Sequence, residues 1–246
     1  MRRLGLAIGC LTILPFGPRG KIQEADLGGS LPWFPVVGLL IGAWLVGVNV
    51  LASLVFPPLV VAACLLLAWV AVTGALHLDG VGDVADGLYG GHTREERLRI
   101  MKDPHVGAMA VVAIVVLLVM KFALLSSVSR ARLTQALFIS PCLGRYAMVL
   151  LGTTLPSARF GEGLAGPFVQ HGKKRSLMVA TAVALPVSGF MLGAAGYVVF
   201  SLAIAGSLLL RVVFQKSLGG ITGDALGAAG ELIEVAALVG VALVKG

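Results

Sequence analysis

Long apolar stretches recur along the chain, and they restrict its fold more than any other feature of the sequence. The stretches at 34–55 and 177–214 contain almost no charged residue. A helix needs about 20 predominantly apolar residues to cross the hydrocarbon core of a bilayer. Charged residues make up only 13% of the chain, whereas a soluble domain typically contains about 25%. We therefore expect an all-α fold, in which a bundle of helices crosses the membrane several times.

The hydrophobic pattern predicts about seven membrane-spanning helices, within a range of six to eight, in a single domain over residues 1–246. The segment 193–196 divides the apolar stretch 177–214 into two helices, although a single long tilted helix is an alternative. We expect spans at 34–55, 59–78, 107–126 and 133–155, two more within 177–214, and a last one that ends near Val244.

The N-terminal segment resembles a signal peptide, because Arg2 and Arg3 precede the apolar residues 4–14. The apolar part before Cys10 is too short for a lipoprotein cleavage site, however. We instead expect a short helix that lies at the membrane interface or dips into it. The three cysteines are isolated within apolar segments, which argues against a disulfide framework or a cysteine metal site.

The net charge of +7 is explained by basic loops rather than by nucleic-acid binding, because basic and aromatic residues are not interleaved. With seven spans and a cytoplasmic N-terminus, the polar segments 79–105, 156–176 and 214–225 lie on one side of the membrane. These segments hold most of the Lys and Arg residues, as the positive-inside rule requires for the cytoplasm. The same arrangement places every acidic cluster on that side.

Three carboxylates follow the second predicted span at spacings of four and three residues. If the backbone is helical here, Asp79, Asp83 and Asp86 share one helical face. Three like charges so close together repel one another, and oxygen ligands of this kind suit Mg²⁺ that also binds substrate phosphates. We expect a metal or phosphate site at these residues, although a solvated acidic loop is the simpler alternative. His77 lies on a different face of the same helix, and it could either act directly or orient a carboxylate.

Further charged residues occur in or beside the predicted spans, where they are costly and usually functional. Asp224 and Glu231 project in related directions from the last helix, and we expect them to complete the metal or substrate site. The alternative is a structural hydrogen-bond network between helices that also includes Glu234. Arg145 in the fourth span could serve either a buried ion pair or the substrate. Candidate substrate contacts in the polar loops are Arg99, Lys102, Asp103 and Arg159.

The motif His77-Leu78-Asp79-Gly80-x-x-Asp83-x-x-Asp86-Gly87 resembles the signature of the cobalamin synthase family, the adenosylcobinamide-GDP ribazoletransferases. Other segments resemble the family in the same order along nearly the whole chain, namely 33–38, 99–107, 219–227 and Glu231. The segment 156–176 is the least similar part.

The resemblance implies a Mg²⁺-dependent transferase in the inner membrane of a bacterium or archaeon, with its active site facing the cytoplasm. It would join adenosylcobinamide-GDP to α-ribazole, or to α-ribazole 5′-phosphate, and release GMP in a late step of cobalamin biosynthesis. The metal would be held by five carboxylates, those of Asp79, Asp83, Asp86, Asp224 and Glu231. A carboxylate or His77 would accept a proton from the ribazole 5′-hydroxyl. The expected partners are the two substrates and the lipid bilayer. Nucleic acid is not expected, and a homo-oligomer or a complex with other cobalamin-assembly enzymes is left open.

Two other classes of membrane protein share part of this pattern. A CDP-alcohol phosphotransferase also uses Asp residues on a helical face and Mg²⁺, but it needs Ala-Arg soon after Asp-Gly. Here Leu88-Tyr89-Gly90-Gly91 follows Asp86-Gly87. An ion-coupled transporter would carry acidic residues near the middle of the bilayer, whereas this acidic motif falls at the end of a predicted span.

Overall fold

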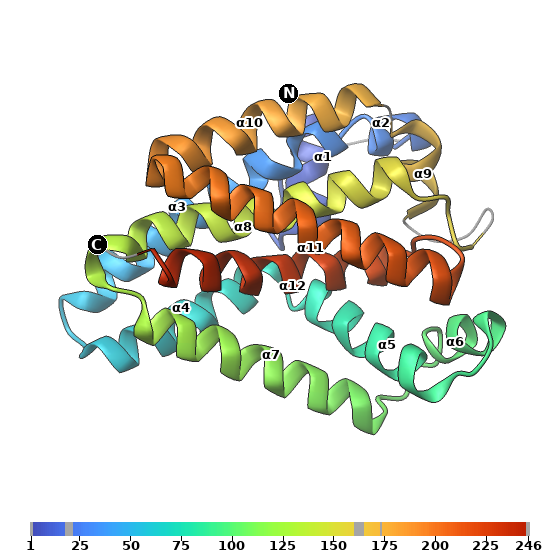
Figure 1. Cartoon of the computed structure of the whole chain (residues 1–246), viewed down its shortest axis with the longest axis horizontal. Helices are drawn as coiled ribbons and strands as arrows, with labels where there is room; N and C mark the ends of the chain where they lie inside the picture. Colours follow the sequence, from blue (N-terminus) through green and yellow to red (C-terminus); the bar gives the residue numbers. More distant parts are fainter. Residues whose placement is uncertain (1, 18–21, 160–164, 173, 245–246) are drawn as a thin grey trace.

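The computed structural model describes residues 2–17, 22–159, 165–172 and 174–244, and these residues form a bundle of helices (Figure 1). Its elements in chain order are α1 (Arg2–Leu11), α2 (Glu24–Gly28), η1 (Leu31–Trp33), α3 (Phe34–Ser53), α4 (Pro58–Thr73), α5 (Leu76–Gly90), α6 (Arg94–Ile100), α7 (Ala108–Ser127), α8 (Arg130–Thr154), α9 (Ala165–His171), α10 (Lys174–Leu192), α11 (Ala194–Leu218) and α12 (Gly223–Ala242). Within the described residues, β-pairing is limited to one isolated bridge, between Ser157 and Ile221. The expected all-α class is confirmed.

Six helical segments in the described part of the chain are long and apolar enough to cross a membrane. Five of them are α7, α8, α10, α11 and α12, and the sixth runs from Glu24 to Ser53 and includes α3. The pair α4 and α5 passes the same test when taken together, which raises the total to seven. This range agrees with the number of spans that the sequence predicts.

The second predicted span is not one continuous helix. α4 ends at Thr73, and α5 leaves it at an angle of 87°. Gly74 and Ala75 separate the two helices, with φ of 62° and 57° in the left-handed region. Glycine adopts this conformation readily, but alanine does so only at a cost, so the packing around the bend must compensate for it. The prediction of a helix over 59–78 is therefore wrong at its C-terminal end.

Most other boundaries agree with the sequence pattern, and the differences lie in the polar segments. The polar segment 79–105 contains the rest of α5 and all of α6. Thr93 and Glu96 form a capping box at the start of α6, in which the backbone amides of His92 and Thr93 keep the pKa of Glu96 below its usual range. α8 begins at Arg130 rather than at Leu133, and α9 occupies part of the loop expected over 156–176. The break between α10 and α11 falls at Gly193, as expected.

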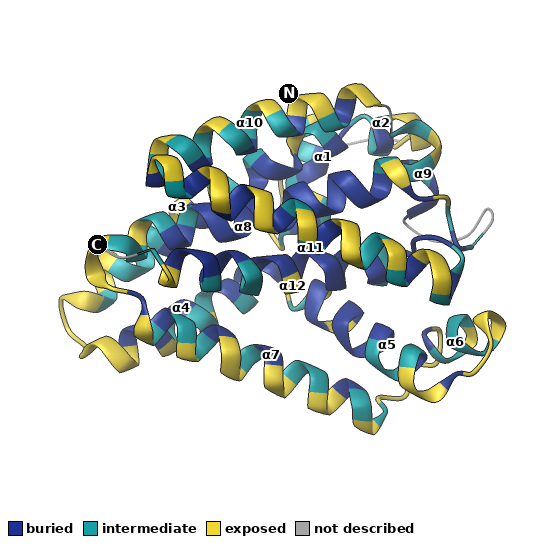
Figure 2. Cartoon of the chain, viewed as in Figure 1, coloured by how far each residue is buried: buried dark blue, intermediate teal, exposed yellow. Residues whose placement is uncertain are grey.

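α8 and α12 form the centre of the bundle (Figure 2). Of the most apolar 18-residue stretch of each helix, 89% is buried inside the bundle in α8 and 72% in α12, but only 22% in α7. Small residues allow this close packing, since a Cβ at Gly144 of α8 would lie 2.7 Å from the Gly230 carbonyl oxygen of α12. The exposed faces of the outer helices carry the apolar side chains that a bilayer would cover.

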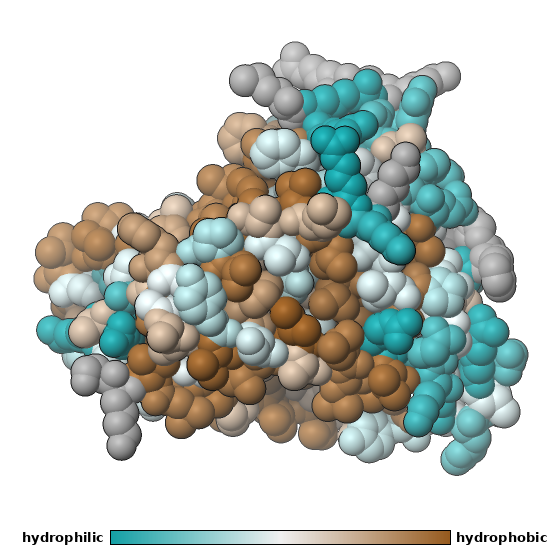
Figure 3. Space-filling model, turned by 45° about the horizontal axis from the view of Figure 1, so that its top comes forward, coloured by the Kyte–Doolittle hydropathy of each residue, from teal (hydrophilic) through white to brown (hydrophobic). Residues whose placement is uncertain are grey.

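The polar segments gather at one end of the bundle. The α5–α6 region, α9 and the turn between α11 and α12 lie at the right of Figure 1, whereas the α3–α4 and α7–α8 turns lie at the left. Hydrophilic residues accordingly collect toward the right of the molecule in Figure 3, and hydrophobic residues cover most of the rest of that face. The expectation that 79–105, 156–176 and 214–225 share one side agrees with this arrangement.

Candidate active site

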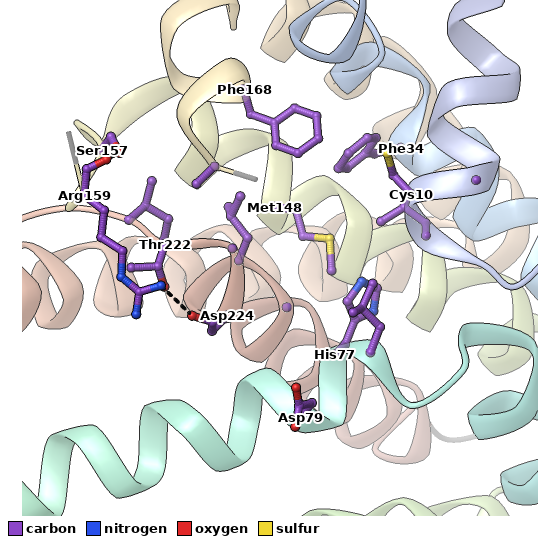
Figure 4. Close-up of a pocket in the computed structure, with 18 residues that line it drawn as sticks. Cys10, Phe34, His77, Asp79, Met148, Ser157, Arg159, Phe168, Thr222 and Asp224 are labelled. Carbon is purple, nitrogen blue, oxygen red and sulfur yellow. Dashed lines mark hydrogen bonds and ion pairs between the residues drawn. The ribbon is translucent and has the colours of Figure 1, made fainter. Parts of the chain in front are cut away.

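A cavity of about 500 Å³ lies between the acidic helix α5, the start of α12, and helices α1, α8 and α9 (Figure 4). One end is lined by apolar side chains and the other by polar ones. His77, Asp79, Arg159 and Asp224 line it, and all four are candidates from the sequence analysis. The sequence did not indicate the contributions of α1 and α9, which supply Cys10 and Phe168.

A second cavity of about 310 Å³ lies further along α5, between this helix and the α6–α7 connection. Its lining is largely polar and includes three carboxylates of α5, namely those of Asp79, Asp83 and Asp86. α5 is helical over Leu76–Gly90, so the predicted shared face of these residues is confirmed. Asp79 lines both cavities and therefore lies where the two meet.

Asp224 approaches α5 because the two helices touch at a glycine. A Cβ at Gly80 would lie 2.5 Å from the Asp224 carbonyl oxygen, so any larger residue would push the helices apart. Thr222 precedes Asp224 and caps α12 by accepting a hydrogen bond of 3.1 Å from the Ala225 amide. The strongest charges acting on half-buried Asp83 are the carboxylates of Asp224 and Asp79, opposed by the guanidinium of Arg159. The site thus concentrates negative charge, and a cation bound there would relieve the repulsion.

Arg159 lies between the acidic residues and the α6 helix. Its guanidinium is 3.5 Å from the Asp224 carboxylate and donates a 3.4 Å hydrogen bond to the Leu98 carbonyl. Its buried Nε has no hydrogen-bond partner among the described residues. The side chain also lines the large cavity, where its charge is suited to a phosphate oxygen.

Asp86 has a structural role that the spacing did not predict. One carboxylate oxygen accepts a 2.7 Å hydrogen bond from the Gly107 amide, and the other accepts a 2.9 Å bond from the Ala110 amide. These amides belong to the first turn of α7, so Asp86 caps that helix from a distance of more than 20 residues in sequence.

The short helix α6 holds the loops around the large cavity in place. Arg94 Nε donates a 2.9 Å hydrogen bond to the Leu218 carbonyl, and its Nη2 donates a 3.0 Å bond to the Ala158 carbonyl. Arg97 Nη1 adds a 3.2 Å bond to the Ser217 carbonyl. These contacts fix the segments that carry Arg159 and Asp224.

The structure places Glu231 away from Asp79 and Asp224. Glu231 accepts a 2.6 Å hydrogen bond from the ammonium group of Lys121, in the interior of the bundle. Seven residues on a helix return to the same direction but advance by about 10 Å along the axis. Asp224 therefore reaches the cavity, whereas Glu231 lies two turns deeper. For Glu231 and Glu234 the geometry favours the alternative of a structural network over the predicted metal or substrate role.

This buried network contains two cations and two anions. Glu234 pairs with both Lys121 and Arg145, and all of these side chains are at most 3% exposed. Arg145 is thus part of a buried ion pair, one of the two roles considered for it. Lys121, which also lies 4.5 Å above the centre of the Trp69 ring, was missed. A single lysine in the otherwise apolar span of α7 was the available signal.

His77 connects the network to the cavity. Its Nδ1 lies 3.4 Å from Nη2 of Arg145, and the side chain also lines the large cavity. A guanidinium can only donate, so Nδ1 accepts in this contact and the proton of the neutral ring is assigned to Nε2.

The remaining candidates lie at the mouth of the smaller cavity or on the surface. Lys102 and Asp103 line that cavity, and Asp103 also pairs with His105 at 2.6 Å. Arg99 is exposed on α6 and lines neither the large cavity nor the small one.

In the part of the chain that the structure describes, no three His, Cys, Asp or Glu side chains are gathered closely enough to enclose a metal ion. Mg²⁺ usually binds through one or two carboxylates, waters and substrate phosphates rather than in an all-protein cage. One or two of the carboxylates of Asp79, Asp83 and Asp224 could supply the protein ligands for this manner of binding.

Comparison with known proteins gives a consistent result. A sequence model described as cobalamin-5-phosphate synthase matches residues 3–242. An adenosylcobinamide-GDP ribazoletransferase of Pseudomonas fluorescens is 41% identical, over 99% of this chain and 100% of its own. Proteins of the same name from Stutzerimonas stutzeri and Acetivibrio thermocellus are 42% and 34% identical, covering 100% and 94% of both chains. No solved structure matches the chain significantly.

Proposed function

The chain belongs to the cobalamin-5-phosphate synthase family, and on this premise we propose how its site joins adenosylcobinamide-GDP to a ribazole in cobalamin biosynthesis. Membership of this family argues against the two alternatives from the sequence, a phospholipid-synthesis enzyme and a transporter.

In the proposed reaction, a ribose hydroxyl oxygen attacks the phosphorus that carries the cobinamide. The bond from this phosphorus to the bridging oxygen breaks, and GMP leaves with that oxygen.

We propose a different attacking hydroxyl from the ribazole 5′-hydroxyl that the resemblance suggested. The family description names a cobalamin 5-phosphate as the product, which requires a ribazole whose 5′ oxygen already carries phosphate. An oxygen that carries phosphate cannot be the nucleophile, so we assign the attack to another hydroxyl of the ribose.

The position of Asp79 supports this function more than any other single observation. A reaction that joins two substrates needs its reacting atoms where two binding regions meet, and Asp79 lines both cavities. Its carboxylate is therefore the best placed to accept the proton of the attacking hydroxyl. Asp83, on the same face, is the best placed to hold a metal ion.

The cationic side chains are suited to the phosphates. Arg159 lines the large cavity, and Lys102 lines the small one. Mg²⁺ held by Asp83 and Asp224 would neutralise charge on the diphosphate. The chain's own residues orient the diphosphate and withdraw the proton from the nucleophile.

We further propose that the polar end of the bundle faces the cytoplasm of a cell whose inner membrane holds the protein. This end carries the basic segments that include Arg94, Arg159 and Arg175, whereas Arg130 and Arg132 lie near the opposite end. The asymmetry follows the positive-inside rule.

The decisive experiment measures GMP release by the purified protein in detergent or nanodiscs, with adenosylcobinamide-GDP and α-ribazole or its 5′-phosphate. We expect GMP release only when both substrates are present, its loss on chelation by EDTA, and its recovery on adding Mg²⁺. Release without a ribazole, or unchanged release in excess EDTA, would contradict the coupled, metal-dependent transfer.

A further inference from the structure

We propose that the large cavity binds the ribazole, with its aromatic base between α1, α8 and α9 and its ribose at Asp79, and that the small polar cavity receives the diphosphate of the other substrate. The proposal rests on the function proposed above, and it adds which substrate occupies which of the two cavities along α5.

The inner end of the large cavity is suited to a flat apolar ring. Phe34 and Phe168 meet edge to face, with ring centroids 5.5 Å apart and planes at 77°. Met148 and Cys10 line the cavity beside them, and Figure 4 shows this group set apart from the charged residues. Aromatic and thioether side chains contact the faces and edges of a bound ring favourably.

The opposite end offers partners for hydroxyl groups. Ser157, Thr222 and Asp224 line it together with Arg159, and Asp79 lies between this end and the apolar one. A ligand that fits both ends has an aromatic base joined to a polyhydroxylated sugar. A ribazole has this composition, because it is a nucleoside of a benzimidazole.

Size and polarity exclude the other candidates for this cavity. Ligand cavities of about 300–1,000 Å³ enclose small molecules, and a corrin ring with its amide side chains is larger than the 500 Å³ present here. Guanine is flat but has several donors and acceptors along its edge. Phe34, Phe168 and Met148 could satisfy none of them, and burying unpaired polar groups is costly. A benzimidazole carries no donor and a single free acceptor once it is joined to ribose.

The small cavity has the complementary character. Asp83 and Asp86 line it with Lys102 and Asp103, and its surface is mainly polar. A diphosphate with a bound cation suits this lining, whereas an apolar base does not. The two substrates then reach Asp79 from separate cavities, so a hydroxyl group in one cavity can meet the phosphorus of a diphosphate in the other. In-line displacement further requires the attacking and leaving oxygens to lie on opposite sides of that phosphorus.

The test compares the two Michaelis constants in variants of the apolar end. In Phe168→Leu, which keeps the site apolar but removes the ring, we expect KM for α-ribazole to rise about tenfold. KM for adenosylcobinamide-GDP should change less than twofold. Phe200→Leu is the matched control, because Phe200 is a buried aromatic residue that pairs with Tyr146 outside the cavity. It should change neither constant.

A second measurement does not depend on how a variant folds. With the unmodified protein, free 5,6-dimethylbenzimidazole should inhibit competitively against α-ribazole and not against adenosylcobinamide-GDP. Inhibition competitive with the GDP-bearing substrate, or a KM for that substrate that rises with Phe168→Leu, would overturn the assignment. Failure of the proposed function gives a different result, since the unmodified protein would then release no GMP.

Discussion

The ammonium group of Lys121 lies 2.6 Å from the carboxylate of Glu231, where α7 meets α12 in the interior of the bundle. Glu234 and Arg145 extend the contact into a neutral group of two cations and two anions. Charges in such a position are tolerated only when they are paired, so this group holds α7, α8 and α12 in one arrangement.

Removing one member of this group should be more harmful than removing an opposite pair. Lys121→Met leaves an uncompensated buried carboxylate, and we expect a loss of about 3–5 kcal/mol in the free energy of unfolding. The double variant Lys121→Met with Glu231→Gln restores neutrality and should recover part of that loss. Thermal unfolding in detergent measures both. Lys216→Met, at an exposed position, is the control, and additive losses in the double variant would refute the coupling.

Asp83→Asn should abolish turnover without destabilising the protein. Asp83 is half-buried beside the carboxylates of Asp224 and Asp79, so removing its charge relieves repulsion while it removes a metal ligand. We expect GMP release to fall at least 100-fold, with the unfolding temperature unchanged or higher. Asp26→Asn, which alters an exposed ion pair with Arg2, is the control for charge removal. Normal activity in Asp83→Asn would rule out its metal role.

Asp86→Ala should act mainly on stability, in contrast to Asp83→Asn. It removes both hydrogen bonds to the first turn of α7, which amounts to the loss of a helix cap, at a cost of about 1–2 kcal/mol. We expect a lower unfolding temperature, whereas Asp86→Asn keeps one acceptor and should lose less. Equal stability of the two variants would show that these bonds contribute little.

Gly80→Ala should separate α5 from α12 and so disturb Asp79 and Asp224 together. The added Cβ would lie 2.5 Å from a main-chain oxygen of Asp224, and backbone cannot move aside cheaply. We expect about 1–3 kcal/mol of destabilisation and a clear loss of activity. Gly47→Ala is the matched control, since nothing lies within 4 Å of its Cβ and alanine favours helices. Similar behaviour of the two variants would refute the close packing.

Arg94→Gln should lower kcat/KM at least tenfold, because it loses charged hydrogen bonds to the Leu218 and Ala158 carbonyls. Those bonds hold the segments that position Asp224 and Arg159. The same assay of GMP release measures the effect. Glu95→Gln, an exposed neighbour on α6, should leave kcat/KM unchanged. An unaltered kcat/KM in Arg94→Gln would show that the loops keep their positions without this helix.

The sequence predicted the local features of the site better than its long-range contacts. The common face of Asp79, Asp83 and Asp86 follows from helical spacing alone. The bend at Ala75 could not be predicted, because alanine has no intrinsic preference for a left-handed conformation. Neither could the cap that Asp86 provides for α7, since the interaction joins segments that only the folded chain brings together.

By itself the sequence determined that this chain forms a membrane bundle and that Asp79, Asp83 and Asp86 share one helical face, because helix length, hydrophobicity and spacing are local properties. Only the tertiary structure decided which acidic residues belong to the cavity. Asp224 and Glu231 point in the same direction from α12, but the rise of the helix separates them by about 10 Å. One therefore faces Asp79 and Arg159, and the other neutralises Lys121, a partner that lies 110 residues away in the sequence.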